Sequence, residues 1–477
     1  MFGPSICYNI IMLDDSARSL FHIVKWLVLA TLIGVVVGAL DAAFLKLLDL
    51  AIGTRNTVPC FYVALPFALY GVALLSRKIA KQHKDYSTDA VIKRINTYRP
   101  VSLMSAAKTF IFSIVTMAVG GSAGKEAPCA DVGAGVSAFL ARVLGLSAQD
   151  QRKMMICGVS AGFAGVFGVP VSGALFGLEV LWVGHIFYEV MFPALVAGIT
   201  AYGVTSWLGV NYLYHPLAFS PVFSEQFFLK VVIAGLFFGL VSVLFIEINK
   251  LVRTVLRYIT LRSGMFMTCM VGGVVLVLMG HFTSTLYLGL GMAGIEGPLS
   301  GAALSSPFGF LYKMITTSIT LAAGGIGGLV TPIFFIGAQA GAMLSAFLHV
   351  DSATLAALGL VAVLAGTANT PLAASIMAIE LFGASIAPYA TVACVISFLI
   401  TGRQSIFPHQ RISLDSGKTP ERAPYNGPER RAADKAALPY HTSTATHVRH
   451  RIKRFWPTQK ARRTAIEQGR ERVQKQK

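Results

Sequence analysis

Charged residues are scarce in this sequence, since Asp, Glu, Lys and Arg make up 13% of its 477 residues. Soluble globular domains average about 25% charged residues. A hydrophobic content of 55% and a mean hydropathy of +0.65 are typical of an integral membrane protein. This composition excludes a soluble enzyme, a disulfide-rich secreted scaffold and a nucleic-acid-binding domain as the main body of the chain.

Cysteine is also scarce, and its six positions are scattered: Cys7, Cys60, Cys129, Cys157, Cys269 and Cys394. No two of them have Cys-x-x-Cys spacing, and the histidines of the apolar segments (His22, His185, His281, His349) show no metal-ligand spacing. We therefore expect no disulfide framework, no metal site and no cofactor. A nucleophile with its base, or a matched pair of aspartates, is also missing, so we expect no catalytic residues and no enzyme.

Positive charge is concentrated at the C-terminal end. Residues 411–477 hold 17 Lys and Arg against 6 Asp and Glu, whereas residues 1–410 hold 23 against 16. Residues 409–477 are too poor in aliphatic residues to form a sizeable core, so we expect a basic, largely disordered tail. Its basic cluster around Phe455 and Trp456 is compatible with RNA binding. A cytoplasmic segment beside the membrane is the simpler interpretation, and we expect no nucleic-acid partner.

Apolar segments follow one another from His22 to Thr401. The first, residues 22–52, is longer than a signal-peptide core of about 7–15 residues. We predict it as the first membrane helix, after a cytoplasmic N-terminal segment of residues 1–21. Many later segments are shorter than the roughly 20 residues that span a bilayer, and Gly or Pro interrupts them. The sequence therefore predicts an all-α integral membrane protein with many tilted and broken helices.

An internal repeat is the most informative feature. Gly120–Pro128 and Gly324–Pro332 share their Gly and Pro positions at a constant offset of 204 residues. Further downstream, Pro170 and Glu179 recur as Pro371 and Glu380 at an offset of 201. Small residues also serve plain helix packing, so chance similarity is the alternative. Two repeat halves, about 22–210 and 225–402, with corresponding interrupted helices indicate a transport site between them.

Each Gly-rich segment is followed by Pro and an apolar run, which predicts a helix that begins inside the membrane. The first backbone N–H groups of such a helix are unpaired, and its dipole is positive at that end. The two starts are therefore candidate anion sites that need no cationic side chain. Glu126 lies in the first start, where its carboxylate can occupy the anion site and leave it when protonated. A structural pair with Lys125 is disfavoured because adjacent helix residues do not face each other.

Three other acidic residues lie in these segments. Glu179 and Glu380 occupy equivalent repeat positions late in a helix, and this equivalence favours a structural role for both. Asp131 either lines the pore or pairs with Lys108 or Arg142, and the sequence leaves both readings open.

The sequence resembles the CLC family of chloride channels and chloride/proton exchangers. Residues 121–128 resemble the GxxGREGP element of that family, residues 328–332 resemble its GxFxP element, and the resemblance runs from about 22 to 408. It implies two inverted repeats, a homodimer with one anion pore per subunit, and a multi-pass protein of the inner (plasma) membrane with a cytoplasmic tail. It also implies that Glu126 is the gating and proton-accepting residue. The implied anion-binding residues are Gly124, Lys125, Leu329, Val330, Thr331, Ser87 and Phe407.

The sequence departs from the pattern of that family at three points. Ser87 stands in a segment that replaces the early GSGIP element, and Phe407 lacks the hydroxyl of the usual pore tyrosine. Exchangers of the family commonly place a second glutamate after the position of Glu179, where this chain has Val180. Thr331 offers a different hydroxyl. It resembles a threonine in the fluoride/proton antiporter branch of the family, which also lacks that second glutamate.

These features predict transmembrane anion transport, with chloride as the favoured ion and Glu126 as the gate. Val180 favours channel-like conduction over coupling to protons. A fluoride/proton or chloride/proton antiporter of the same family is the alternative. The expected partners are thus chloride or other small anions, including fluoride, together with protons, the lipid bilayer and a second copy of the chain.

Overall fold

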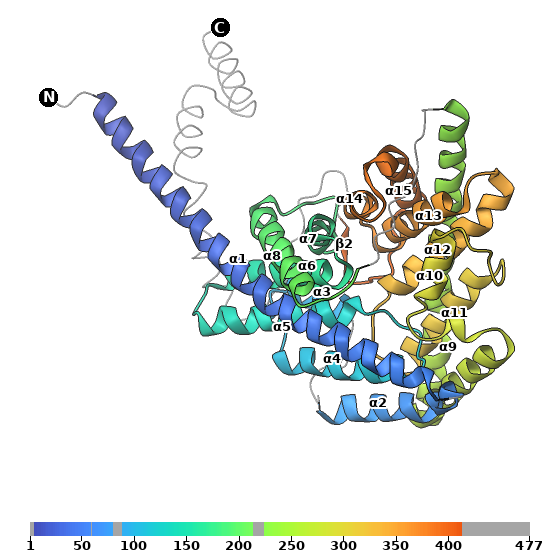
Figure 1. Ribbon diagram of the computed structural model, residues 1–477. Helices are drawn as coiled ribbons and strands as arrows, with labels where there is room; N and C mark the ends of the chain where they lie inside the picture. The colour runs from blue at the N-terminus through green and yellow to red at the C-terminus, as the bar shows by residue number, and fades with distance from the viewer. Residues whose placement is uncertain (1–3, 59, 80–87, 213–223, 413–477) are drawn as a thin grey trace, which may run out of the picture. The chain divides into compact units, whose positions relative to one another are not determined.

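The computed structural model describes residues 4–58, 60–79, 88–212 and 224–412 (Figure 1). The helices in this part of the chain are α1 (Pro4–Asn56), α2 (Leu65–Ile79), α3 (Thr88–Asn96), α4 (Leu103–Ala118), α5 (Glu126–Val143), α6 (Ala148–Phe167), α7 (Pro170–Glu179), α8 (Tyr188–Trp207), α9 (Glu225–Phe282), α10 (Ala293–Leu299), α11 (Gly309–Ala322), α12 (Val330–Leu348), α13 (Ser352–Ala368), α14 (Pro371–Phe382) and α15 (Ala387–Thr401). Three 3-10 turns, η1 (Phe61–Ala64), η2 (Thr285–Tyr287) and η3 (Ala384–Ile386), lie between them. The two strands β1 (Trp182–Val183) and β2 (Arg411–Ile412) pair in parallel. This architecture confirms the predicted all-α fold.

The chain divides into two compact units, Met1–Leu414 and Asp415–Lys477. The second unit holds most of the predicted basic tail and lies outside the described residues. Within the first unit, α1 contacts α4, α5, α6 and α8, and Figure 1 shows it as one long helix crossing these elements. It begins at Pro4, so the helix extends well beyond the apolar stretch 22–52 that predicted it.

In the described part of the chain, five helices are long and apolar enough to cross a bilayer: part of α1, the whole of α9, α8, α12 and the η3–α15 segment. At 1.5 Å per residue, about 20 residues cover a hydrocarbon core about 30 Å thick. Helix α9 is an exception in length, and it bends at Gly264, whose φ of 82° breaks it into two helices. Among the other described helices, α6 (20 residues) and α5 (18 residues) reach a similar length but are too polar to count as spans, and the rest are shorter, as the Gly and Pro interruptions predict.

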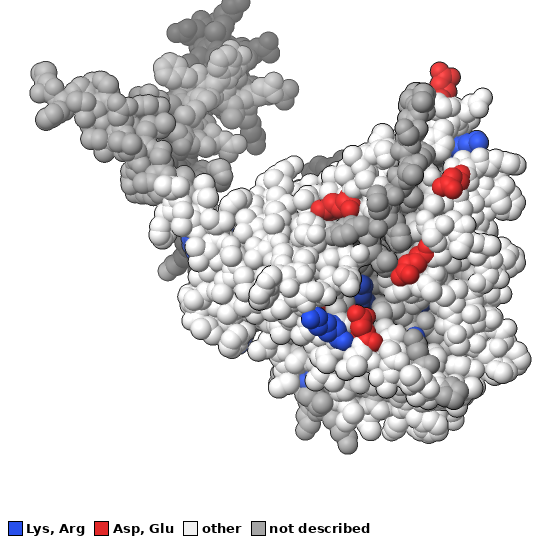
Figure 2. Space-filling model, viewed as in Figure 1, with Lys and Arg blue, Asp and Glu red and all other residues white. Residues whose placement is uncertain are grey.

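The outer surface of the helix bundle is apolar. Large side chains such as Phe67, Trp207, Leu240 and Phe282 are more than half exposed. Figure 2 shows that few charged side chains interrupt this face of the molecule. An apolar surface of this extent is unfavourable in water but matches lipid tails. The surface therefore confirms the prediction of a membrane protein with several spanning helices.

Two short helices, α7 and α14, pack against each other, and each is capped by an acidic residue of the other. The Glu179 carboxylate at the end of α7 accepts hydrogen bonds from the second and third amides of α14, at 3.1 and 2.8 Å. The Glu380 carboxylate of α14 accepts from the second and third amides of α7, at 2.8 and 2.9 Å. Both caps satisfy unpaired N–H groups and complement a helix dipole. This exchange gives both glutamates a structural position, as their repeat equivalence predicts.

Removing either cap is expected to destabilise the bundle. Glu179→Ala and Glu380→Ala each leave two amides without acceptors, which costs about 1–2 kcal/mol for a helix cap. Both variants should therefore lower the thermal unfolding temperature in detergent, and Glu179→Ala should lower it more because Glu179 is only 8% exposed. Glu247→Ala, which removes half of an exposed pair with Lys250, is the control and should leave the unfolding temperature unchanged. Equal unfolding temperatures for all three variants would contradict the capping role.

Candidate functional site

The two Gly-rich segments of the repeat meet in the structure. Gly124 and Gly328 form an antiparallel bridge in which each amide donates to the carbonyl of the other at 2.8 Å. Two residues after each glycine, α5 begins at Glu126 and α12 begins at Val330, again 204 residues apart. The positive ends of both helix dipoles are therefore brought to one point inside the bundle, as the repeat predicts.

The Glu126 side chain crosses from α5 to the start of α12. Its Oε1 accepts a hydrogen bond from the Val330 amide at 2.6 Å. Its Oε2 accepts from the Thr331 amide at 3.3 Å and from the Thr331 hydroxyl at 2.9 Å. The side chain is buried, with 2% exposure. Within the described part of the chain this carboxylate forms no ion pair, and two amides, a hydroxyl and a helix dipole stabilise its negative charge.

Glycine is required beside the carboxylate. A Cβ atom on Gly328 or on Gly124 would overlap the carboxyl group of Glu126. Any other residue would therefore fill the space that the carboxyl group occupies. The two glycines of the bridge thus make room for the Glu126 side chain.

Two threonines hold the Gly-rich segments in place, and sequence reasoning missed them. The Thr320 hydroxyl of α11 accepts a hydrogen bond from the Ser122 amide at 3.0 Å. The Thr116 hydroxyl of α4 accepts from the Ile326 amide at 3.1 Å. Each half of the chain thus fixes the loop of the other half. The signal was present, because Thr-x-x-x-Gly-Gly occurs at residues 116–121 and 320–325 with the same offset of 204.

Lys125 and Leu329 precede the two helices as their N-terminal caps. The Lys125 ammonium lies 5.7 Å from the centre of the Phe167 ring. Lys125 and Thr331 line the same cavity of about 200 Å³, so the cation faces the space next to the helix starts. Leu329 is buried with 7% exposure. The structure thus brings Lys125, Leu329 and Thr331 together with Glu126.

The remaining predicted anion-site residues are less well placed. Phe407 is buried with 2% exposure in the main hydrophobic cluster, which also holds Val330 and Ile333. Its side chain offers no hydrogen-bond donor to an anion. Ser87 lies outside the described residues.

Two further predicted positions are buried. Asp131 lies beside Thr109 of α4, and its Oδ1 has no hydrogen-bond partner within the described part of the chain. Val180, which stands where exchangers of the family commonly carry a second glutamate, is fully buried and apolar. Among the described residues, no group of three or more His, Cys, Asp or Glu has the arrangement of a metal site.

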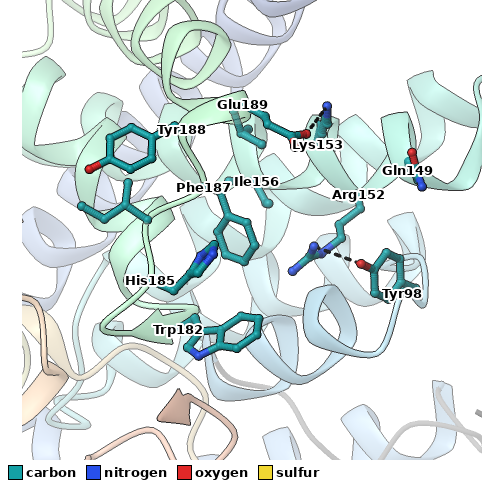
Figure 3. Close-up of a pocket in the computed structure, with 12 residues that line it drawn as sticks. Tyr98, Gln149, Arg152, Lys153, Ile156, Trp182, His185, Phe187, Tyr188 and Glu189 are labelled. Carbon is teal, nitrogen blue, oxygen red and sulfur yellow. Dashed lines mark hydrogen bonds and ion pairs between the residues drawn. The ribbon is translucent and has the colours of Figure 1, made fainter. Parts of the chain in front are cut away.

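A hollow of about 620 Å³ lies elsewhere in the molecule, around the start of α6 and the segment before α8 (Figure 3). The Arg152 guanidinium lies 4.7 Å from the ring centres of both Tyr98 and Phe187, and it donates to the Tyr98 hydroxyl at 3.2 Å. Lys153 pairs with Glu189 at 2.8 Å. These cations therefore bind other parts of the chain, and the hollow lacks the convergent helix starts of the Glu126 site.

Comparison with known proteins gives consistent matches. A model of the voltage gated chloride channel family matches residues 68–402. A protein of Pseudomonas syringae pv. tomato named "Chloride/fluoride channel protein" is 37% identical over 403 residues, which are 82% of this chain and 87% of the relative.

Solved structures show the same fold. The crystal structure of a CLC-type fluoride/proton antiporter has a TM-score of 0.76 and 26% identity, and the match covers 82% of this chain and 99% of the other. A slow cyanobacterial Cl-/H+ antiporter has a TM-score of 0.70 and 18% identity, with 79% and 94% covered. The second likeness concerns the fold alone.

Proposed function

Because the chain belongs to the voltage-gated chloride channel (CLC) family of membrane anion transporters, we propose that it exchanges fluoride for protons across the membrane. In this proposal Glu126 is the gate and the proton acceptor. The anion binds at the start of α12, where the Glu126 carboxylate lies in this structure.

One observation carries the choice of fluoride, namely that the Thr331 hydroxyl joins the backbone amides at the anion position. Fluoride is the smallest halide and accepts the strongest hydrogen bonds, so removing its hydration water costs more free energy than for any other halide. The Thr331 hydroxyl and the amides of Val330 and Thr331 lie 2.6–3.3 Å from the carboxylate oxygens of Glu126. The same three donors would replace much of the hydration of a fluoride ion bound in place of the carboxylate. The names of the 37% identical relative and of the 26% identical structure, both of which mention fluoride, support the same choice.

The exchange follows from competition for one site. While Glu126 is ionised, its carboxylate holds the donors of Val330 and Thr331 and excludes an anion. When a proton binds to Glu126, the neutral side chain loses most of its attraction to the helix dipole and leaves. A fluoride ion then takes the vacated donors. The proton and the anion thus use the same gate in alternation, which couples their movements.

Chloride conduction is the second candidate, and Val180 favours it. An apolar, fully buried residue at this position removes the inner glutamate that exchangers of the family commonly carry. Without another proton route, the chain would conduct chloride as a channel with Glu126 as its gate.

The proposal includes the assembly and the boundaries of the transport unit. Residues 22–408 form this unit, with repeat halves of about 22–210 and 225–402, and two copies assemble as a homodimer in the plasma membrane. The positive-inside rule supports a cytoplasmic location for the basic tail of residues 409–477. Gly124, Lys125, Leu329, Val330 and Thr331 line the anion site, and Ser87 and Phe407 are assigned to its inner wall by resemblance.

Transport by proteoliposomes tests the proposed exchange. An outward fluoride gradient should drive protons inward against their own gradient in the wild type, because each departing anion leaves a site that Glu126 must reoccupy. Glu126→Gln should abolish this proton movement while the protein still carries fluoride. A fluoride electrode and a pH electrode measure both fluxes together. Fluoride efflux no faster than chloride efflux would contradict the choice of ion, and anion flux without protons would favour the channel.

The Thr331 hydroxyl is expected to determine the preference for fluoride. A hydrogen bond to a charged group contributes about 1.5–3 kcal/mol. Thr331→Val should therefore slow fluoride transport by about tenfold or more and slow chloride transport less, because chloride accepts weaker hydrogen bonds. Thr331→Ser retains the hydroxyl and is the matched control. Equal losses for both ions in Thr331→Val would show that the hydroxyl does not discriminate between them.

A further inference from the structure

Another buried carboxyl, in addition to those of Glu126, Asp131 and Glu179, lies in the membrane part of the molecule. Asp41 is in the apolar stretch of α1 and is 1% exposed. Neither of its carboxyl oxygens has a hydrogen-bond partner within the described residues. The carboxylates of Glu126, Glu179 and Glu380 all accept hydrogen bonds from helix starts. An intramembrane acid with no such support is costly and therefore points to a function.

Four segments surround Asp41. The Cys129 thiol of α5 lies beside the carboxyl. On α6, a Cβ placed on Gly165 would come within 2.5 Å of Oδ2, so the absence of a side chain there makes room for Asp41. This hypothetical Cβ atom would also lie 3.4 Å from the Thr205 methyl of α8, so Asp41 and Thr205 both pack against Gly165. Tyr212, which follows α8, donates its hydroxyl hydrogen to the Gly165 carbonyl at 2.6 Å and also contacts the Thr205 hydroxyl.

Asp41 thus lies between the gate and a cavity. On one side, Cys129 is one turn after Glu126 on α5 and within electrostatic reach of Asp41, Lys125 and Glu126. On the other side, Tyr212 lines the cavity of about 200 Å³ that Lys125 and Thr331 also line. The titratable or charged groups that face Asp41 from the packed elements are therefore the Cys129 thiol and the Tyr212 hydroxyl, with Lys125 beyond Cys129.

We propose that Asp41 is a second proton-binding carboxyl of the transport unit, and that it exchanges its proton with Glu126. This inference rests on the proposed proton exchange. Asp41 would supply a second proton-binding carboxyl, which exchangers of the family commonly have as a glutamate where this chain has Val180. In the transfer step, the O–H bond of Asp41 breaks, a water molecule between the two carboxyls relays the proton, and an O–H bond forms on Glu126, which then leaves the start of α12. A hydronium ion from the aqueous side then passes its proton through cavity water to the Asp41 carboxylate, past the Tyr212 hydroxyl, and a neutral water molecule remains.

The neutral state of Asp41 also fits its surroundings. A protonated carboxyl carries no charge, so it can remain buried among apolar helices without a cation. When Glu126 is protonated and has left the start of α12, the Asp41 carboxylate and Lys125 carry opposite charges, both within electrostatic reach of Cys129. Only one of the two carboxyls then needs to be ionised at a time.

Asp41→Asn tests the proposal, because it preserves shape and polarity but cannot release a proton. The variant is expected to lower the fluoride-driven proton flux of proteoliposomes by at least tenfold. Its thermal unfolding temperature and its fluoride affinity in detergent should equal those of the wild type, and Asp41→Glu should restore part of the flux. Glu247→Gln, which alters an exposed carboxyl of α9, is the control and should transport as the wild type does.

The outcomes separate this inference from the function on which it rests. Wild-type proton flux in Asp41→Asn would overturn the role of Asp41 and leave the proposed exchange intact. Loss of flux together with a lower unfolding temperature and weaker fluoride binding would overturn it as well, because the residue would then be structural. A wild-type protein that moves fluoride without protons would instead overturn the exchange itself, and this inference with it.

Discussion

The structure depends on one interaction, the binding of a negative charge by the first amides of α12 inside the membrane. An ion in the hydrocarbon region must exchange its water for protein donors, and cationic side chains there are themselves costly. Unpaired backbone amides at a helix start avoid that second cost because they are neutral and already fixed. The rest of the site serves to bring these amides within reach of an anion. Gly124 and Gly328 leave space for it, and Thr116 and Thr320 hold the two loops in position.

Because the two halves of the chain are related by a repeat, each half completes the other. The loop bridge pairs Gly124 with Gly328, the threonines of α4 and α11 bind the loop of the opposite half, and Glu179 and Glu380 cap each other's short helices. These contacts join residues about 200 positions apart, so neither half alone could satisfy the hydrogen bonds of its loops and helix starts. The repeat also places one acidic side chain, Glu126, where the second half has Val330, and in the proposed function this difference provides the gate.

Much of this arrangement could be predicted from the sequence because Gly and Pro mark where helices break. The offset of 204 residues predicted the paired starts of α5 and α12, and the intramembrane Glu126 does lie where these two starts meet. The reciprocal caps could not be paired from sequence, because nothing in a linear pattern says which amides a carboxylate will meet. The extension of α1 to Pro4 was missed because the helix was predicted from its apolar stretch. The residues before that stretch include Asp14, Asp15 and Arg18, and hydropathy does not detect a helix that continues through polar residues. Asp41 was missed because a single acid in an apolar helix carries no spacing signal.

Fluoride binding to the purified protein, measured by titration calorimetry across a range of pH, tests the central claim that Glu126 and the transported anion compete for the same donors. The account predicts that wild-type affinity falls as the pH rises, because the ionised carboxylate then holds the amides of Val330 and Thr331. Glu126→Gln should bind fluoride with an affinity that is independent of pH and at least as high as that of the wild type at low pH. A wild-type affinity that does not change with pH, or a pH dependence that persists in Glu126→Gln, would contradict it.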